Sequence, residues 1–378
     1  RFFAPRTGQH TQKSQIYILT LKFRTMRIGV LKEPQGENRV VFLPEAVKTL
    51  VKMQLEVWVE RSAGEGAHVP DSAYEEAGAS MHTREEVFSQ ADAVAQISAL
   101  TDEDVAKLNH GQVVFNVAQP LFNQGLVKKM QAGKATLFSL DTIPRITRAQ
   151  AMDVLSSMAT VSGYKAVLEA AHTLPKFFPM FMTAAGTVRP SKMLILGAGV
   201  AGLQAIATGR KLGAVVEVFD VRAAVKEEVQ SLGGKFIEVE GAKEDKDAGG
   251  YAVEQTEEFK KKQQQLVHDH AAKSDVIITT AQIPGKKAPL LIRKETVEAM
   301  QPGSVIVDLA ASTGGNCELT QNNKTIAHNQ VKIIGNSNYP SSLPVHASQM
   351  FGKNLINFLK LIVDKEGGMQ LNFEDEIV

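Results

Sequence analysis

A glycine-rich hexapeptide, GAGVAG at residues 197–202, is the most chemically informative stretch of the sequence. It follows the apolar run MLIL at 193–196 and leads into a helix-like segment. A turn of this kind between a strand and a helix binds the pyrophosphate of a dinucleotide, because the helix N-terminus attracts negative charge. We expect Gly197 to form the tight turn, Gly199 to let the pyrophosphate approach the backbone, and Gly202 to let the helix pack on the sheet.

An acidic residue follows at the distance that a dinucleotide-binding fold requires. The second apolar run, VVEVF at 215–219, ends at Asp220, eighteen residues after Gly202. A carboxylate in this position accepts hydrogen bonds from both hydroxyls of the adenosine ribose and repels a 2′-phosphate. The pattern therefore predicts NAD(H) rather than NADP(H). Arg222 could in principle receive a 2′-phosphate, but with Asp220 before it we expect Arg222 to pack over the adenine or to be exposed.

A second polar cluster, RITRAQAMDVLSS at 145–157, lies between the two halves of the chain. A helix beginning near Thr147 would place Gln150 and Asp153 on neighbouring positions, three residues apart. Arg145 and Asp153 have two interpretations: an ion pair at a helix end, or part of the cleft between domains where dinucleotide enzymes hold the nicotinamide. Spacing alone leaves both open.

The polar segment EGAKEDKDAGG at 240–250 ends in Gly250 and is followed by Tyr251. It is either a lid whose aromatic residue closes on the cofactor or a simple solvent loop, and spacing alone favours the loop.

The composition excludes several classes of protein. The chain has 378 residues, of which 44% are hydrophobic and 22% charged, as in ordinary globular proteins. A formal net charge of +1 gives no electrostatic reason to expect binding to nucleic acid or to an acidic membrane surface. The single cysteine, Cys317, excludes internal disulfides, and no apolar run approaches the ~20 residues of a membrane span. His268 and His270 lack a third ligand nearby, so we expect no metal site.

Residues 1–25 differ from the rest, with five basic residues and no acidic one. They are either a transit peptide or sequence that precedes the native start at Met26. We favour the second interpretation and expect this segment to lie outside the fold.

The rest of the chain alternates apolar runs with helix-like stretches, which is typical of parallel strands joined by crossover helices. We expect two Rossmann-like, doubly wound parallel-sheet domains with a cleft between them. A helix at 152–172 should connect them, and a last helix at 348–363 should cross back. The expected strands are 28–31, 55–59, 93–97, 113–115 and 136–140 in the first domain, and 193–196, 215–219, 235–239, 276–279, 305–309 and 331–334 in the second.

These elements predict a division of the chain into two domains. Residues 26–145 together with 346–378 form the N-terminal domain, and 146–345, with the connecting helix, form the NAD(H)-binding domain.

Several longer strings make the chain similar to a known family. They are PRITRAQ at 144–150 with its continuation to 157, TAAGTV at 183–188, TTAQIPG at 279–285, GSVIVDLA at 303–310 and GGNC at 314–317. From about Met26 onward, the chain resembles the NAD(H)-binding alpha subunit, or domain I, of the proton-translocating NAD(P) transhydrogenases. Its N-terminal domain would then be of the type shared by alanine dehydrogenase and transhydrogenase.

The resemblance implies roles for the polar cluster. Arg145 and Ser156 would hold the nicotinamide carboxamide, Asp153 would orient Arg145, and Gln150 would reach the nucleotide on a partner domain. A direct hydride transfer between two nicotinamides requires apposition, orientation and exclusion of water rather than a general acid or base. This would explain why the cluster contains no histidine.

The resemblance also implies further contacts and partners. The loop ending at Gly250 and Tyr251 would close over NAD(H), and Val200, Ala281 and Gln282 would join the cofactor-binding residues. The hairpin at 183–188 would lie at a homodimer interface. NADP(H) would be bound by a partner subunit, and membrane-embedded subunits would carry the protons. The chain would therefore be cytoplasmic and peripheral on the inner membrane, held through its partners.

The main alternative is alanine dehydrogenase, which shares the opening MRIGVLKE at 26–33 and ENRV at 37–40. That enzyme requires a histidine and a lysine, whose positions fall here on Gln119, or its neighbours Ala118 and Pro120, and near Ser98. Neither basic group is present at those positions, which removes the acid–base chemistry. A non-catalytic NAD(H)-sensing module is a third possibility.

Overall fold

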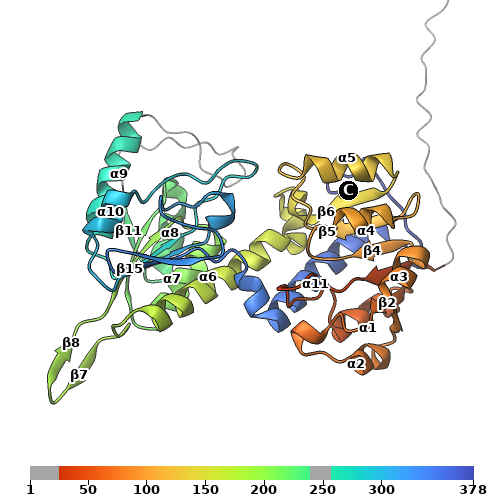
Figure 1. Cartoon of the computed structure of the whole chain (residues 1–378), viewed down its shortest axis with the longest axis horizontal. Coiled ribbons are helices and arrows are strands. Elements are labelled where there is room, and N and C mark those ends of the chain that lie inside the picture. The colour runs from red at the N-terminus through yellow and green to blue at the C-terminus, as the bar shows by residue number, and fades with distance from the viewer. Residues whose placement is uncertain (1–24, 239–256) are drawn as a thin grey trace, which may run out of the picture.

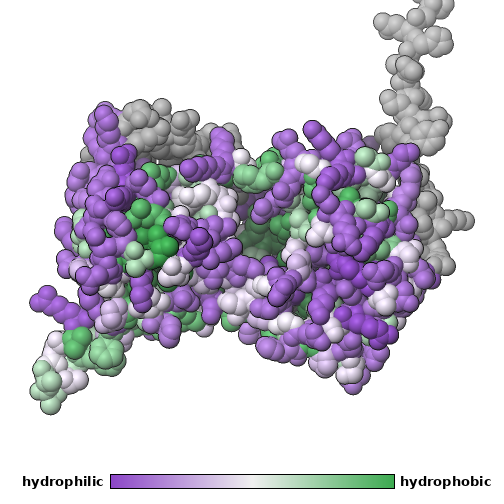
Figure 2. All heavy atoms as spheres, viewed as in Figure 1, coloured by the Kyte–Doolittle hydropathy of each residue, from purple (hydrophilic) through white to green (hydrophobic). Residues whose placement is uncertain are grey.

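The computed structural model describes residues 25–238 and 257–378, which form two α/β units, each built on a parallel sheet (Figure 1). The long helix α6 (Val154–Thr173) leads from the first unit into the second, and α11 (Pro344–Ile362) returns to the first. The expected fold class, two Rossmann-like parallel-sheet units, is confirmed. Figure 2 shows a hollow between the two units on the face in view.

The first sheet has six parallel strands in the spatial order 3-2-1-4-5-6, which is the order of dinucleotide-binding sheets. These strands are β3 (Ser80–His82), β2 (Glu56–Glu60), β1 (Arg27–Val30), β4 (Ala93–Ala95), β5 (Val113–Asn116) and β6 (Thr136–Ser139). The accompanying helices are α1 (Pro44–Lys52), α2 (Asp71–Glu76), α3 (Arg84–Gln90), α4 (Asp102–Ala106) and α5 (Gln124–Ala132). Strands β4 and β5 are buried throughout, because helices cover both faces of the sheet.

The second sheet repeats this order and adds an antiparallel edge strand. Its strands are β11 (Lys235–Ile237), β10 (Val215–Phe219), β9 (Lys192–Leu196), β12 (Val276–Thr279), β13 (Val305–Asp308), β15 (Val331–Ile334) and β14 (Thr325–His328). The helices around it are α7 (Val200–Lys211), α8 (Lys226–Ser231), α9 (Glu257–Ala271) and α10 (Lys294–Ala299).

Helix α11 packs into the core of the first unit, although it follows the second sheet in the sequence. The ring centroid of Phe358 lies 5.2 Å from that of Phe138 and 6.1 Å from that of Phe115. Leu355 and Leu359 are also buried there. Apolar residues three and four positions apart give α11 this buried face. The N-terminal and C-terminal stretches of the described chain therefore share one hydrophobic core.

Within the two large sheets, β3 and β14 have no counterpart among the expected apolar runs. Both lie at a sheet edge, where β3 has one buried residue and β14 has none. An edge strand needs few apolar residues, so its hydrophobic pattern is weak.

The helix expected to begin near Thr147 begins later. Thr147–Met152 forms a short 3-10 helix, η3, and Asp153 leaves the helical conformation (φ −73°, ψ 93°) before α6 starts. Gln150 and Asp153 therefore do not lie on one continuous α-helical face. The reason is local: the Asp153 side chain caps the first turn of α6 and so ends the preceding turn.

A hairpin of β7 (Phe181–Thr183) and β8 (Gly186–Val188) extends from the second unit, at the lower left of Figure 1. All six of its strand residues are exposed, and Met182 reaches 77% exposure. Within the described ranges, the helices all lack the combination of length and apolar character needed to cross a bilayer.

Candidate functional site

The glycine fingerprint folds as a turn between β9 and α7. Gly197 has φ +106°, a conformation that side chains disfavour. A Cβ on Gly202 would clash with the Gly197 carbonyl oxygen, whereas a Cβ on Gly199 would meet nothing within 4 Å. Helix α7 begins after Gly199 without a side-chain cap, and Val200 in its first turn is 39% exposed. The turn is therefore a cradle with open space at Gly199 and a positive helix end beside it, which fits a pyrophosphate.

Asp220 lies at the end of β10 and is bonded to the fingerprint turn. Its Oδ2 accepts a hydrogen bond from the Ala198 N–H (2.7 Å), and its side chain is 6% exposed. Arg222 does not extend freely: its guanidinium turns back onto Asp220 (Nη2–Oδ2 2.7 Å, Nε–Oδ1 2.9 Å). The nearby negative charge raises the pKa of Arg222, chiefly through that hydrogen bond. The hydroxyls of a bound ribose would thus share the Asp220 carboxylate with Arg222 or displace Arg222 from it.

The loop after β12 faces the fingerprint across the point where the strand order reverses. The Thr280 hydroxyl donates to the carbonyl of Gly197 (3.1 Å), which joins this loop to the turn. The Gln282 side chain donates to the carbonyl of Leu309 (3.0 Å). Ligands of such sheets bind at this reversal, between the first and fourth strands. Ala281 and Gln282 lie in this loop, at the reversal of the strand order.

Two buried residues that the sequence analysis assigned no role hold this loop in place. The amide of Asn316 accepts from the Ala281 N–H (3.0 Å) and donates to the Ala281 carbonyl (2.8 Å). Asp308, fully buried at the end of β13, accepts from the backbone N–H groups of Asn316 (2.8 Å) and Cys317 (3.0 Å). Asp308 belongs to the string 303–310 and Asn316 to the string 314–317. The sequence could therefore have singled out both residues, but it could not show their hydrogen-bond partners. Burial raises the pKa of the Cys317 thiol to about 11, which keeps it protonated.

The polar cluster lies where the first unit leads into α6. Ser156 donates its hydroxyl to Asp153 Oδ2 (2.6 Å), and its N–H donates to Asp153 Oδ1 (2.9 Å). Arg145 and Gln150 are exposed in the preceding turn. The structure thus brings Asp153 and Ser156 together at the N-terminus of α6.

Helix α6 connects this cluster to the fingerprint. At Gly163 it packs so closely on the first turn of α7 that a Cβ would clash with the carbonyl oxygen of Ala201. At 1.5 Å per residue, Ser156 is about 10 Å along α6 from this crossing. The two predicted halves of the site are therefore joined by one continuous helix. Gly250 and Tyr251 lie outside the described residues.

The first sheet has the same strand order, but its reversal point is filled by the chain itself. The Glu33 carboxylate accepts the N–H groups of Ile97 (2.5 Å) and Ser98 (3.0 Å), which follow β4. Glu33 is 7% exposed, and burial raises its pKa to about 7. Backbone donors that could bind an anionic ligand are thus occupied. Gln119, in the loop after β5, adopts a left-handed φ of 49°.

The two histidines of α9 contact neighbouring elements of the second unit. His268 Nδ1 lies 2.9 Å from the Thr296 hydroxyl, and His270 Nδ1 lies 2.7 Å from Glu217 Oε2. Among the residues that the structure describes, no group of three or more His, Cys, Asp or Glu side chains is arranged to hold a metal ion.

Comparison with known families places the chain. Residues 29–162 match the family described as "Alanine dehydrogenase/PNT, N-terminal domain", and residues 166–378 match "Alanine dehydrogenase/PNT, C-terminal domain". The chain belongs to the alanine dehydrogenase/PNT family. Within that family it groups with the alpha subunits of NAD(P) transhydrogenases, as the following similarities show.

The chain is 47% identical to NAD(P) transhydrogenase subunit alpha of Haemophilus influenzae, over 93% of this chain and 69% of that protein. It is 48% identical to an NAD(P) transhydrogenase alpha-subunit chain of Rhodospirillum rubrum, over 93% and 94% of the two chains. A transhydrogenase structure from Sinorhizobium meliloti superposes with a TM-score of 0.85 at 42% identity, covering 93% and 96%. Alanine dehydrogenase of Mycobacterium tuberculosis is 26% identical, over 84% and 82%.

Proposed function

We propose that this chain binds NAD(H) and exchanges a hydride directly with NADP(H) held on a partner subunit, in the sense NADH + NADP+ to NAD+ + NADPH. The partner couples this exchange to proton translocation across a membrane. The observation that carries the proposal is the connection, through the single helix α6, between the fingerprint cradle and the Asp153–Ser156 cluster. A dinucleotide seated on α7 would extend toward that cluster.

In this proposal the chain binds and orients rather than transferring protons. The α7 amides and Gly199 hold the pyrophosphate, Asp220 holds the ribose, and NAD(H) supplies the reacting hydride. Arg145 and Ser156 hold the carboxamide, and Asp153 orients Arg145. Asp153 also fixes the Ser156 hydroxyl through its 2.6 Å hydrogen bond. Catalysis would come from apposition of the two nicotinamides and exclusion of water.

The same proposal extends to the domains and partners. Residues 26–145 with 346–378 form one domain, and 146–345 form the NAD(H)-binding domain. The exposed apolar residues of the hairpin, among them Phe181 and Met182, support a homodimer in which each arm is covered by the other copy. Membrane subunits would hold the chain at the cytoplasmic face of the inner membrane.

A rapid-mixing experiment tests the function. NADH is mixed with an oxidised NADP analogue and this chain, with and without a separately prepared NADP(H)-binding transhydrogenase domain. Fast hydride transfer only in the mixture supports the proposal. If NADH binds but no transfer occurs, a dehydrogenase or a sensor is favoured, and pyruvate with ammonium is the next substrate to test.

Gln150→Asn is expected to slow this transfer about tenfold while leaving NADH affinity nearly unchanged, because the shortened side chain no longer reaches the partner's nucleotide. Stopped-flow transfer rates and NADH titration measure the two effects. A large loss of NADH binding would contradict the assignment of Gln150 to the interface.

Asp220→Asn is expected to lower NADH affinity about tenfold and to bring NADPH affinity closer to it. The substitution removes the charge that repels a 2′-phosphate and releases Arg222 from its ion pair. Equilibrium titration with both nucleotides measures the ratio of their affinities. An unchanged ratio would show that Asp220 does not set this selectivity.

A further inference from the structure

The turn that carries Gln150, η3, packs against the core of the first unit. Ala149 and Met152, on the inner side of η3, are buried in the first core, while Gln150 is exposed. Just before Gln150, the guanidinium of Arg148 forms a two-pronged ion pair with Asp375 (Nη1–Oδ2 2.7 Å, Nη2–Oδ1 2.5 Å). This contact joins residues 227 positions apart in the sequence.

The other side of the turn is held by α11. The Ala151 carbonyl accepts hydrogen bonds from the side-chain amides of Asn354 (2.8 Å) and Asn357 (3.1 Å). Gln150 therefore lies between two residues that are both bound by the C-terminal stretch of the chain. A 3-10 helix is less stable than an α-helix, so these outside contacts have a large share in fixing its geometry.

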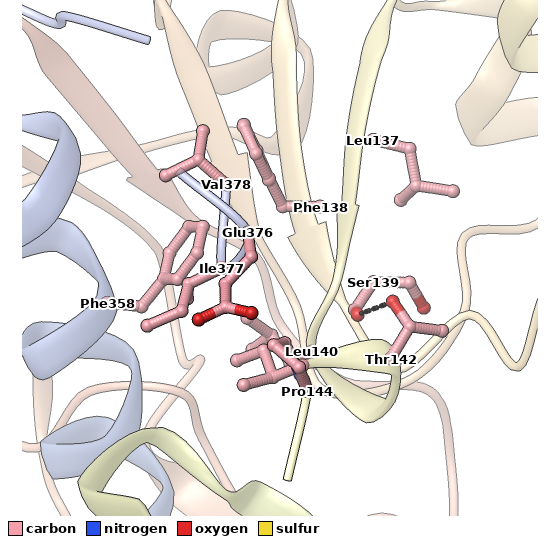
Figure 3. Close-up of a pocket in the computed structure, with 11 residues that line it drawn as sticks. Leu137, Phe138, Ser139, Leu140, Thr142, Pro144, Phe358, Glu376, Ile377 and Val378 are labelled. Carbon is pink, nitrogen blue, oxygen red and sulfur yellow. Dashed lines mark hydrogen bonds between the residues drawn. The ribbon is translucent and has the colours of Figure 1, made fainter. Parts of the chain in front are cut away.

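The segment that carries Asp375 is itself ordered. Asp375 Oδ1 accepts from the Ile377 N–H (2.9 Å), and the Asp375 N–H donates to the Asn372 carbonyl (3.1 Å). The Ile377 side chain is 6% exposed. In Figure 3 it lies beside Phe358 at a cavity of about 230 Å³, whose lining also includes Pro144, the residue before Arg145. The C-terminal segment thus lies against the same loop that leads into the polar cluster.

The Arg148–Asp375 pair is better suited to fixing the orientation of the η3 turn than to raising the free energy of unfolding. The hydrogen bond from Arg148 lowers the pKa of Asp375 to about 2, so the carboxylate stays charged at neutral pH. The Arg148 side chain is 50% exposed, and exposed pairs add little to the free energy of unfolding. A two-pronged arginine–carboxylate pair nevertheless fixes direction.

We propose that Asp375 is a positioning residue for hydride exchange, acting through Arg148 to hold the turn that presents Gln150. This rests on the proposed function. Asp375 touches neither nucleotide, and its effect is on the orientation of Gln150 toward the partner domain.

The test compares Asp375→Asn with Glu374→Gln in the full chain. Both remove one carboxylate from the same C-terminal segment, but of the two only Asp375 bonds Arg148. We expect Asp375→Asn to lower the hydride-transfer rate with the partner domain about tenfold, at unchanged NADH affinity, and Glu374→Gln to match wild type. Arg148→Lys keeps the positive charge but cannot form the two-pronged pair, so its hydride-transfer rate should fall by the same factor. The double variant Arg148→Lys/Asp375→Asn should transfer hydride no more slowly than either single variant.

Hydrogen exchange supplies a readout that needs no partner. Peptides covering residues 145–157 should exchange faster in Asp375→Asn than in wild type or Glu374→Gln. The inference would be overturned if Asp375→Asn had the same hydride-transfer rate and the same hydrogen-exchange rates in residues 145–157 as the wild type. If wild type itself transfers no hydride, the proposed function fails, while the exchange comparison still decides whether Asp375 holds the turn.

Discussion

Gly202→Ala is expected to abolish measurable NADH binding, with at least a hundredfold loss of affinity, and to destabilise the chain by about 3 kcal/mol. The added methyl group would clash with the Gly197 carbonyl oxygen, which is backbone and cannot rotate away. Relief requires α7 to move off the sheet or the fingerprint turn to open. Either movement displaces the α7 amides that are proposed to hold the pyrophosphate.

Gly199→Ala is the matched comparison. Its Cβ meets no protein atom within 4 Å, so stability should stay within about 0.5 kcal/mol of wild type. Its NADH affinity should still fall at least tenfold, because the methyl group occupies the space through which the pyrophosphate approaches. Denaturant unfolding and NADH titration of both variants separate the two effects. Wild-type NADH binding by Gly199→Ala would place the pyrophosphate elsewhere.

Asp308→Asn is expected to destabilise the second unit by about 3 kcal/mol and to weaken NADH binding about tenfold. The carboxylate accepts five hydrogen bonds, from the Thr279 and Thr320 hydroxyls and from the N–H groups of Ala310, Asn316 and Cys317. An amide turns one acceptor oxygen into a donor that faces other donors, in a site with no exposure to water.

The loss of NADH binding follows from the chain of contacts beyond Asp308. Asn316 loses a backbone anchor, and Asn316 holds Ala281 beside the proposed NAD(H) site. Thr320→Val is the control, because it removes a single donor and should cost about 1 kcal/mol. Unfolding curves and NADH titration measure both properties. If Asp308→Asn weakened binding no more than Thr320→Val, the network would have no role in holding the loop.

The two sheets show that the same strand order does not by itself make a nucleotide site. After β9 the chain has glycines and an open cradle, whereas after β1 it has Glu33, whose carboxylate takes the backbone donors of Ile97 and Ser98. The proposal that the second sheet, and not the first, binds NAD(H) therefore rests on side chains at the carboxyl ends of the strands rather than on topology.

The sequence alone determined the fold class and the dinucleotide fingerprint. Their determinants are local: strand, glycines, helix and Asp220 follow one another within a single βαβ unit, where spacing translates directly into geometry. It also carried the strings that identify the family. It did not reveal β3 or β14, because edge strands bury too little to show an apolar pattern.

Only the tertiary structure decided which residues support the site. The Asn316–Ala281 contact spans 35 positions and the Arg148–Asp375 contact spans 227, and periodicity carries no information about such distant pairs. The break at Asp153 and the turning of Arg222 onto Asp220 depend on the same side chains that the sequence singled out. The hydrogen-bond partners of Asp153 and Arg222 were decided by tertiary packing. A polar side chain has several possible partners in the sequence, and the folded structure selects among them.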